Sequence, residues 1–167
     1  MSKIVWFLDI DGVINSFPTP PQVTQWNFQN KTILGYSIWY APELIAFIDS
    51  VHESGQVEVR WLTTWEHRAN DDFAPSVGFR NRFEVEERQH AYGDYSWWKA
   101  DQVAKFRQAN PDTAIIWSDD DILFYPEAVN RALSGAEEVL ALCPATNEGL
   151  NQVSLDDIVE FIGDHSV

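Results

Sequence analysis

The chain has 167 residues, of which 45% are hydrophobic, 26 are acidic and 11 are basic, so its formal net charge is −15. We expect one domain over residues 1–167, because a chain of about 150 residues buries roughly 68–70% of its unfolded surface. The charge argues against extended nucleic-acid binding, which depends on clustered Lys and Arg. It does not exclude a phosphorylated ligand where a bound cation reverses the local sign.

A single cysteine, Cys143, excludes an intramolecular disulfide and a multi-cysteine zinc site, and it favours a reducing compartment. We expect it to be a small, buried apolar residue. No apolar run approaches the roughly 20 residues that span a bilayer. The first residues predict a strand rather than a signal peptide, because their apolar stretch is short and ends in an acid. The expected location is cytoplasmic, without membrane association.

The first 40 residues predict a buried strand followed by a hairpin. Ile4–Ile10 is a continuous apolar run with the β-branched and aromatic content of a parallel strand. Three prolines follow between residues 15 and 40, and apolar and polar residues alternate through Gln25–Phe28 and Ile33–Tyr40. We interpret 15–40 as a loop and a hairpin that form a flap.

The rest of the chain alternates between helical and strand patterns. The first half has a helix from Pro42 to Gly55, a strand at 57–63, a short helix at 67–73 and a strand at 83–86. A helix at 97–108 capped by Ser96, a strand at 113–117, a helix at 126–133 closed by Gly135 and a strand at 138–143 follow. The last helix has Ser154 and Asp157 in capping-box spacing, and one of its faces carries Leu155, Ile158, Val159 and Ile162. This alternation predicts an α/β fold, a doubly wound parallel sheet with helices on both faces.

Polar side chains follow the predicted strands, at the edge where such sheets bind ligands. They are Asp9, Asp11 and Gly12 after the first strand, Thr63, Thr64 and Trp65 after the second, Lys99 at the start of a helix, and Asp119, Asp120 and Asp121 after the third. Crowded carboxylates take up protons or gather a hard cation, and Mg²⁺ prefers oxygen ligands.

These residue types could perform phosphoryl transfer. Side chains two apart on an extended segment point the same way, so Asp9 and Asp11 could share a pocket while Gly12 turns the backbone. A carboxylate can attack phosphorus and form an aspartyl-phosphate. The Thr63 hydroxyl and the Lys99 ammonium would hold the phosphoryl oxygens and neutralise their charge.

Four segments together resemble the motifs of the haloacid dehalogenase-like (HAD) phosphohydrolase superfamily, in that family's order, over about residues 4–143. They are Phe-Leu-Asp9-Ile-Asp11-Gly12-Val, Trp-Leu-Thr63-Thr64-Trp65, Lys99, and Ile-Trp-Ser-Asp119-Asp120. The resemblance implies that Asp9 is the nucleophile and a Mg²⁺ ligand, and that Asp11 is the general acid and base, with its backbone carbonyl at the metal. It also places Thr63 and Lys99 on the phosphate, with Thr64, Gly12 and Trp65 nearby, and Asp119 or Asp120 at the metal.

The insertions are short. The 28 residues between Val13 and Pro42 allow a flap, and the 31 residues from Glu66 to Ser96 allow a small insertion, but neither allows a cap domain. In the family, a nearly capless site goes with bulky or macromolecular phosphorylated substrates. The Trp-Leu-Thr-Thr-Trp-Glu sequence is also similar to HAD modules of RNA-repair proteins, which implies a nucleotide or nucleic-acid terminus as partner.

Structural alternatives remain open at each position. Asp9 and Asp11 could be solvated acids at the end of a strand. Residues 119–121 could form a helix N-terminus, with Asp121 capping the next turn. Thr63 could be an ordinary strand residue, and Lys99 could be a surface lysine. Trp6, Trp61 and Trp117 are expected in the core, while Trp65, Trp26 and Trp39 could face substrate or pack. For His67, His90 and Asn70 a surface role competes with a place in the pocket.

Three functions follow from these patterns. The leading one is a Mg²⁺-dependent phosphatase acting on a phosphorylated small molecule or nucleic-acid end. A phospho-receiver signalling domain uses similar residues, but its acceptor aspartate precedes its threonine and lysine on a middle strand, whereas here Thr63 and Lys99 precede the second acidic group. A catalytically inactive HAD fold that serves as a binding module is the third.

Overall fold

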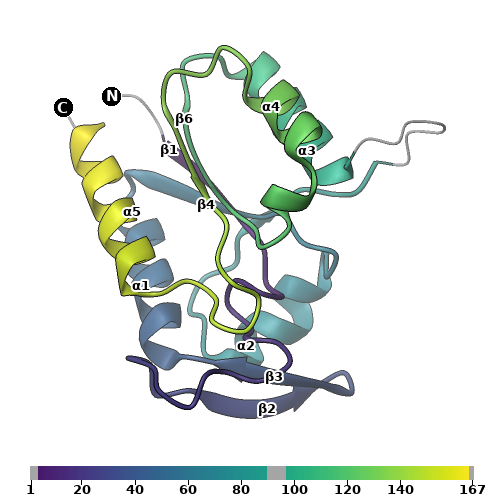
Figure 1. The fold of residues 1–167 in the computed structure, drawn as a ribbon, viewed down its shortest axis with the longest axis vertical. Coiled ribbons are helices and arrows are strands. Elements are labelled where there is room, and N and C mark those ends of the chain that lie inside the picture. The colour runs from purple at the N-terminus through teal and green to yellow at the C-terminus, as the bar shows by residue number, and fades with distance from the viewer. Residues whose placement is uncertain (1–3, 90–96, 166–167) are drawn as a thin grey trace.

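The computed structural model describes residues 4–89 and 97–165. At its centre is a five-stranded parallel sheet in the order β5-β4-β1-β6-β7 (Figure 1). The strands are β1 (Ile4–Leu8), β4 (Val57–Trp61), β5 (Glu84–Val85), β6 (Ala114–Ser118) and β7 (Val139–Leu142). The central β1 pairs through Leu8 with Trp61 on one side and Ser118 on the other.

All five residues of β1 are buried, because both faces of the sheet are covered. Trp6 packs in one hydrophobic cluster and Phe7 in a second, as the alternation of side chains along a strand requires. Helices α1 (Pro42–Glu53), α2 (Ala74–Val77) and α5 (Gln152–Asp164) contribute to the Trp6 cluster, and α3 (Trp98–Ala109) and α4 (Pro126–Leu133) to the Phe7 cluster. The predicted doubly wound α/β fold is confirmed.

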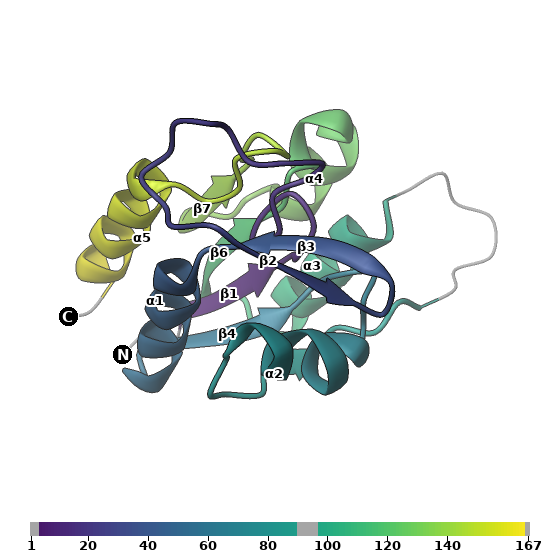
Figure 2. The same cartoon turned by 90° about the horizontal axis from the view of Figure 1, so that it is seen from below.

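The flap is a two-stranded hairpin of β2 (Gln29–Ile33) and β3 (Tyr36–Tyr40). The hairpin lies beyond the carboxyl end of β1 and runs across that end of the sheet (Figures 1 and 2). The predicted hairpin is present, but the alternation at Gln25–Phe28 does not mark its first strand. That strand is β2, which the apolar pattern misses because four of its five residues are exposed. The turn at Leu34 and Gly35, where φ is positive at both residues, sets the register instead.

The other predicted elements are present, α4 with the predicted ends and the rest with shifted ends. β1 and β4 stop two residues earlier than predicted, so Asp9 and Thr63 lie just beyond the sheet. The short helix begins as a π-helix, Ala69–Phe73, and continues into α2. Ser96, the expected cap of α3, lies outside the described residues.

The last helix differs from the prediction at its start. Its capping box joins Asn151 and Ser154 rather than Ser154 and Asp157, because the helix begins at Gln152. Leu155 and Ile158 are buried as expected, but Val159 is exposed, since it falls outside the stripe that faces the sheet. None of the helices in residues 4–89 and 97–165 is long and apolar enough to cross a membrane.

Candidate active site

Three adjacent strands deliver the predicted polar residues to one edge of the sheet. Asp9, Thr63 and Asp119 follow β1, β4 and β6, which are neighbours in the order β4-β1-β6. Backbone hydrogen bonds continue past the strand ends, because the Asp9 amide donates to the Ser118 carbonyl (3.1 Å) and the Leu62 amide to the Leu8 carbonyl (2.9 Å). The strand order therefore gathers residues that lie up to 110 positions apart in sequence.

Lys99 links two of the carboxylates. Its Nζ donates to Asp9 Oδ2 (2.8 Å) and to Asp119 Oδ2 (2.6 Å). The three residues are 4%, 6% and 0% exposed respectively. Lys99 lies in the first turn of α3, and its Nζ lies 5.7 Å from the centre of the Trp97 ring. A lysine so deeply buried between two carboxylates is not an ordinary surface lysine.

Burial dominates the electrostatics of this ionic group. It raises the pKa of Asp9, although Lys99, the Ile10 amide and the Thr63 hydroxyl each lower it. Burial, together with the charge of Asp9, raises the pKa of Asp119 to about 8. For Lys99, burial works to lower the pKa, but the two carboxylates outweigh it and the pKa rises. The ammonium is shared by two acids, so the group holds excess negative charge when both acids are ionised.

Asp120 completes a cluster that fits a metal ion. Oxygen atoms of Asp9, Asp119 and Asp120 lie within 4.8 Å of one another. Asp120 is half-buried, and its Oδ2 accepts a hydrogen bond from the Thr146 hydroxyl (2.8 Å). Three converging carboxylates without nitrogen or sulfur donors match the ligand preference of Mg²⁺.

Gly12 makes room for this cluster. Its φ of +73° is in the left-handed region, and a Cβ at this position would collide with the Asp120 carboxylate. Asp121, expected to cap the next turn, precedes the 3₁₀ turn Ile122–Phe124, but its side chain makes no capping hydrogen bond. Its backbone amide instead donates to Asp119 Oδ1 (3.0 Å).

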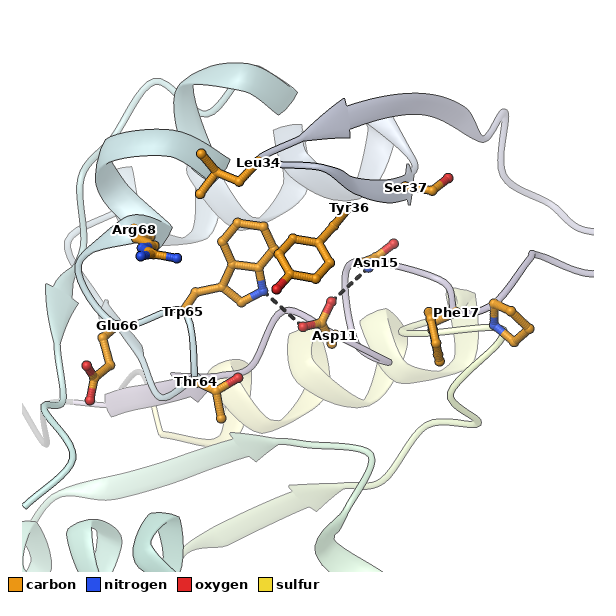
Figure 3. A pocket seen from close by; sticks show the side chains of 11 residues that line it. Asp11, Asn15, Phe17, Leu34, Tyr36, Ser37, Thr64, Trp65, Glu66 and Arg68 are labelled. Carbon is orange, nitrogen blue, oxygen red and sulfur yellow. Dashed lines mark hydrogen bonds between the residues drawn. The ribbon is translucent and has the colours of Figure 1, made fainter. Parts of the chain in front are cut away.

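Asp11 lies outside the carboxylate cluster and is exposed at the edge of a pocket (Figure 3). Its Oδ1 accepts from Asn15 Nδ2 (2.8 Å), and its Oδ2 accepts from Trp65 Nε1 (2.9 Å). Asn15 is itself fixed, because its Oδ1 accepts from the Trp39 amide of β3 (2.9 Å). The loop after β4 thus holds the Asp11 carboxylate directly, through Trp65, and the flap hairpin holds it indirectly, through Asn15.

The pocket beside Asp11 has a volume of about 620 Å³. Its lining comes from the loop after β1, the turn of the flap and the loop after β4: Asp11, Asn15, Phe17, Pro18, Leu34, Tyr36, Ser37, Thr64, Trp65, Glu66 and Arg68. Thr64 is therefore at the pocket, while Thr63 is buried beside Asp9 and its Oγ1 also accepts from the Trp65 amide (3.3 Å).

Other predicted candidates have structural roles. Trp6, Trp61 and Trp117 are fully buried, as expected, and Trp26 is also buried, with its Nε1 donating to the Leu150 carbonyl. Asn70 is buried, where it accepts from Trp61 Nε1 and donates to the Phe83 carbonyl.

Two histidines and the single cysteine were also considered in the sequence. His67 is exposed and pairs with Glu87, and His90 lies outside the described residues. Cys143 is only partly buried, contrary to the prediction, because it follows the edge strand β7, whose own residues are partly buried or exposed. Its thiol donates to the Asp120 carbonyl (3.3 Å).

Asn15 and Thr146 were not singled out from the sequence, although both contact site carboxylates. Thr146 follows β7, so the rule that ligand-binding residues follow parallel strands could have found it. Asn15 has no comparable signal, because its contact depends on how the loop after β1 folds back.

The parallel sheet and the acidic cluster at its carboxyl edge define a Rossmann-like α/β fold of the HAD type. The chain belongs to the family described as the HAD domain in Swiss Army Knife RNA repair proteins, because the sequence model of that family matches residues 5–155. A search of curated proteins gives no match. HAD domains are in general hydrolases, chiefly phosphatases. The predicted similarity to this superfamily and to its RNA-repair branch is confirmed.

Proposed function

We propose that this protein is a Mg²⁺-dependent phosphatase that hydrolyses a phosphomonoester through an aspartyl-phosphate on Asp9. The observation that carries the proposal is the buried group of Asp9, Lys99 and Asp119, which lies beside Asp120 and next to a pocket edged by Asp11. A structural ion pair would not need a third carboxylate nearby, nor an exposed acid two residues from the first.

In the first step, an Asp9 carboxylate oxygen attacks phosphorus while the bond to the leaving oxygen breaks. Asp11 gives its proton to that oxygen, so the product leaves as an alcohol. In the second step, the Asp11 carboxylate takes a proton from water, whose oxygen attacks the phosphorus of phospho-Asp9. Inorganic phosphate leaves, and both carboxylates return to their starting states.

Lys99 and Thr63 hold the nucleophile and neutralise charge. Lys99 donates to Asp9, and the Thr63 hydroxyl also bonds Asp9, so both groups lie where phosphoryl oxygens arrive. Asp9, Asp119 and Asp120 would hold Mg²⁺, which would offset the repulsion between a phosphate dianion and a carboxylate. Asn15 and Trp65 position Asp11 by occupying one lone-pair site on each oxygen, which leaves the other sites for the transferred proton.

The proposed substrate is a nucleotide or a phosphorylated nucleic-acid end. The family occurs in RNA repair proteins, and in residues 4–89 and 97–165 the site opens into a pocket with no cap domain over it. The formal charge of −15 disfavours contacts with a long phosphate backbone.

The experiment is a phosphate-release assay over phosphorylated metabolites and 5′- or 3′-phosphorylated oligonucleotides, with Mg²⁺ and with a chelator. We expect Mg²⁺-dependent release that Asp9→Asn abolishes. Asp112→Asn, an exposed aspartate before β6, is the matched control and should behave as wild type. No Mg²⁺-dependent release over the whole panel would overturn the proposal and favour a binding module.

A further inference from the structure

We infer that the pocket beside Asp11 binds a nucleoside leaving group, so that the protein recognises the terminal nucleotide of its substrate and little beyond it. The inference rests on the proposed phosphatase function. It adds the chemical class of the group that departs and the residues that select it, namely Phe17, Tyr36 and Trp65.

The position of the pocket follows from the direction of the reaction. In a displacement at phosphorus the leaving oxygen lies on the side opposite the attacking Asp9. Asp11 protonates that oxygen, and Asp11 is part of the pocket wall. Whatever is attached to the leaving oxygen therefore extends into this pocket or past its rim.

The pocket wall gathers several exposed aromatic and apolar side chains in one place. Phe17, Leu34 and Tyr36 are 57%, 50% and 62% exposed, and all three line this pocket. Single exposed apolar side chains are common on protein surfaces, but a contiguous group of them marks a binding site. The Tyr36 and Trp65 rings lie 5.8 Å apart at an angle of 62° (Figure 3). Trp65 is partly buried and supports the exposed Tyr36 ring, whose face offers a surface on which a planar base can stack.

The backbone around the pocket is also unusual. Among the described residues, the two non-glycine positions with positive φ are Leu34 (51°) and Glu66 (48°), and both line this pocket. Such conformations cluster at ligand sites, where the surrounding structure keeps them in place. The flap turn and the loop after β4 therefore each place one residue with a strained backbone conformation at the pocket.

Size and charge restrict the occupant. A volume of about 620 Å³ is within the range of about 300–1,000 Å³ typical of small-molecule sites, which suits a nucleoside and not a duplex. The exposed Ser37 and Thr64 supply polar groups for a sugar and a base edge. Arg68 is the one basic residue that lines the pocket, so this lining has no row of basic side chains that could bind further phosphates.

The test compares KM and kcat for nucleoside 3′- and 5′-monophosphates, glycerol phosphate, a phosphotyrosine peptide, and ten-nucleotide strands with a 3′ or 5′ phosphate. We expect a KM about tenfold lower for a nucleotide than for glycerol phosphate, the size of one base–aromatic stack. Strands should match the better mononucleotide within about threefold, with little change between 50 and 200 mM salt, because backbone contacts would add a steep salt dependence.

Two variants of one residue isolate the stacking contact. Tyr36→Ala should raise the nucleotide KM about tenfold and the glycerol phosphate KM much less, while Tyr36→Phe, which keeps the ring, should match wild type. Equal losses for glycerol phosphate and nucleotides, a preference for the phosphotyrosine peptide, or a strongly length-dependent KM would each overturn the inference.

Calorimetric titration with unphosphorylated nucleosides separates this inference from the proposed function. Nucleoside binding that Tyr36→Ala weakens would support the pocket assignment even in a chain without phosphatase activity. Hydrolysis of glycerol phosphate together with no detectable nucleoside binding would leave the phosphatase proposal in place and overturn the pocket assignment.

Discussion

The ionic group at Asp9 and the pocket at Asp11 differ in almost every physical property, although these aspartates are two residues apart. Asp9, Lys99 and Asp119 are buried, charged and linked by short hydrogen bonds. The pocket is open, and its wall carries exposed rings such as Tyr36. Under the proposed function, the buried group carries out the chemistry and the pocket selects what is attached to the phosphate. Changes in each region should therefore have different signatures.

The largest effect is expected when the charge of the buried group is unbalanced. Lys99→Met would leave Asp9 and Asp119 buried without their cation, so we expect a loss of about 3–5 kcal/mol in the free energy of unfolding, together with loss of activity. Urea unfolding in a chelator measures it. Lys105→Met, at an exposed lysine on the same helix, should have little effect. An unchanged unfolding midpoint for Lys99→Met would show that the ion pairs are not formed as described.

Asp11→Asn should lower the turnover number and leave Mg²⁺ binding unchanged. We expect kcat to fall about 10²–10⁴-fold, the usual contribution of a general acid and base. Mg²⁺ affinity should remain, because the Asp11 carboxylate is not part of the cluster formed by Asp9, Asp119 and Asp120. Kinetics and calorimetry on the same preparation check both statements, and weakened Mg²⁺ binding would contradict the role given to Asp11.

Gly12→Ala should have the opposite signature and weaken Mg²⁺ binding by the carboxylate cluster. The new Cβ would push the Asp120 carboxylate aside, so we expect Mg²⁺ to bind about 10–100-fold more weakly. Gly35→Ala is the matched control, because its φ is also positive but nothing lies near its Cβ. Equal Mg²⁺ affinities in the two variants would mean that Asp120 does not contribute to binding.

The smallest effect should depend on the substrate. Trp65→Phe removes the N–H that holds Asp11 but keeps a ring in the pocket. We expect about a tenfold loss of kcat/KM, which reports the first step alone, with glycerol phosphate, whose leaving group needs a proton. We expect little loss of kcat/KM with 4-nitrophenyl phosphate, whose leaving group does not need one. Trp39→Phe is the control, since Trp39 contributes only its backbone amide to this network. The same loss with both substrates would point to a general structural defect.

The sequence was most informative where function follows directly from strand position. Asp9, Thr63 and Asp119 could be predicted together because the ends of parallel strands meet at one edge. Lys99 could be placed only by resemblance, since nothing in a helical pattern shows which lysine is buried. The hairpin register escaped prediction because β2 is polar and its turn sets the pairing. Asn15 escaped because its contacts join loop and flap, which local patterns do not encode.

The most direct test of the account is a rapid acid quench of the protein during turnover of a ³²P-labelled aryl phosphate with Mg²⁺. An acyl phosphate survives acid, so peptide mapping should find label on Asp9, with a higher level in Asp11→Asn because the second step then lacks its base. Release of phosphate at every quench time with no label on any peptide would contradict covalent catalysis by Asp9.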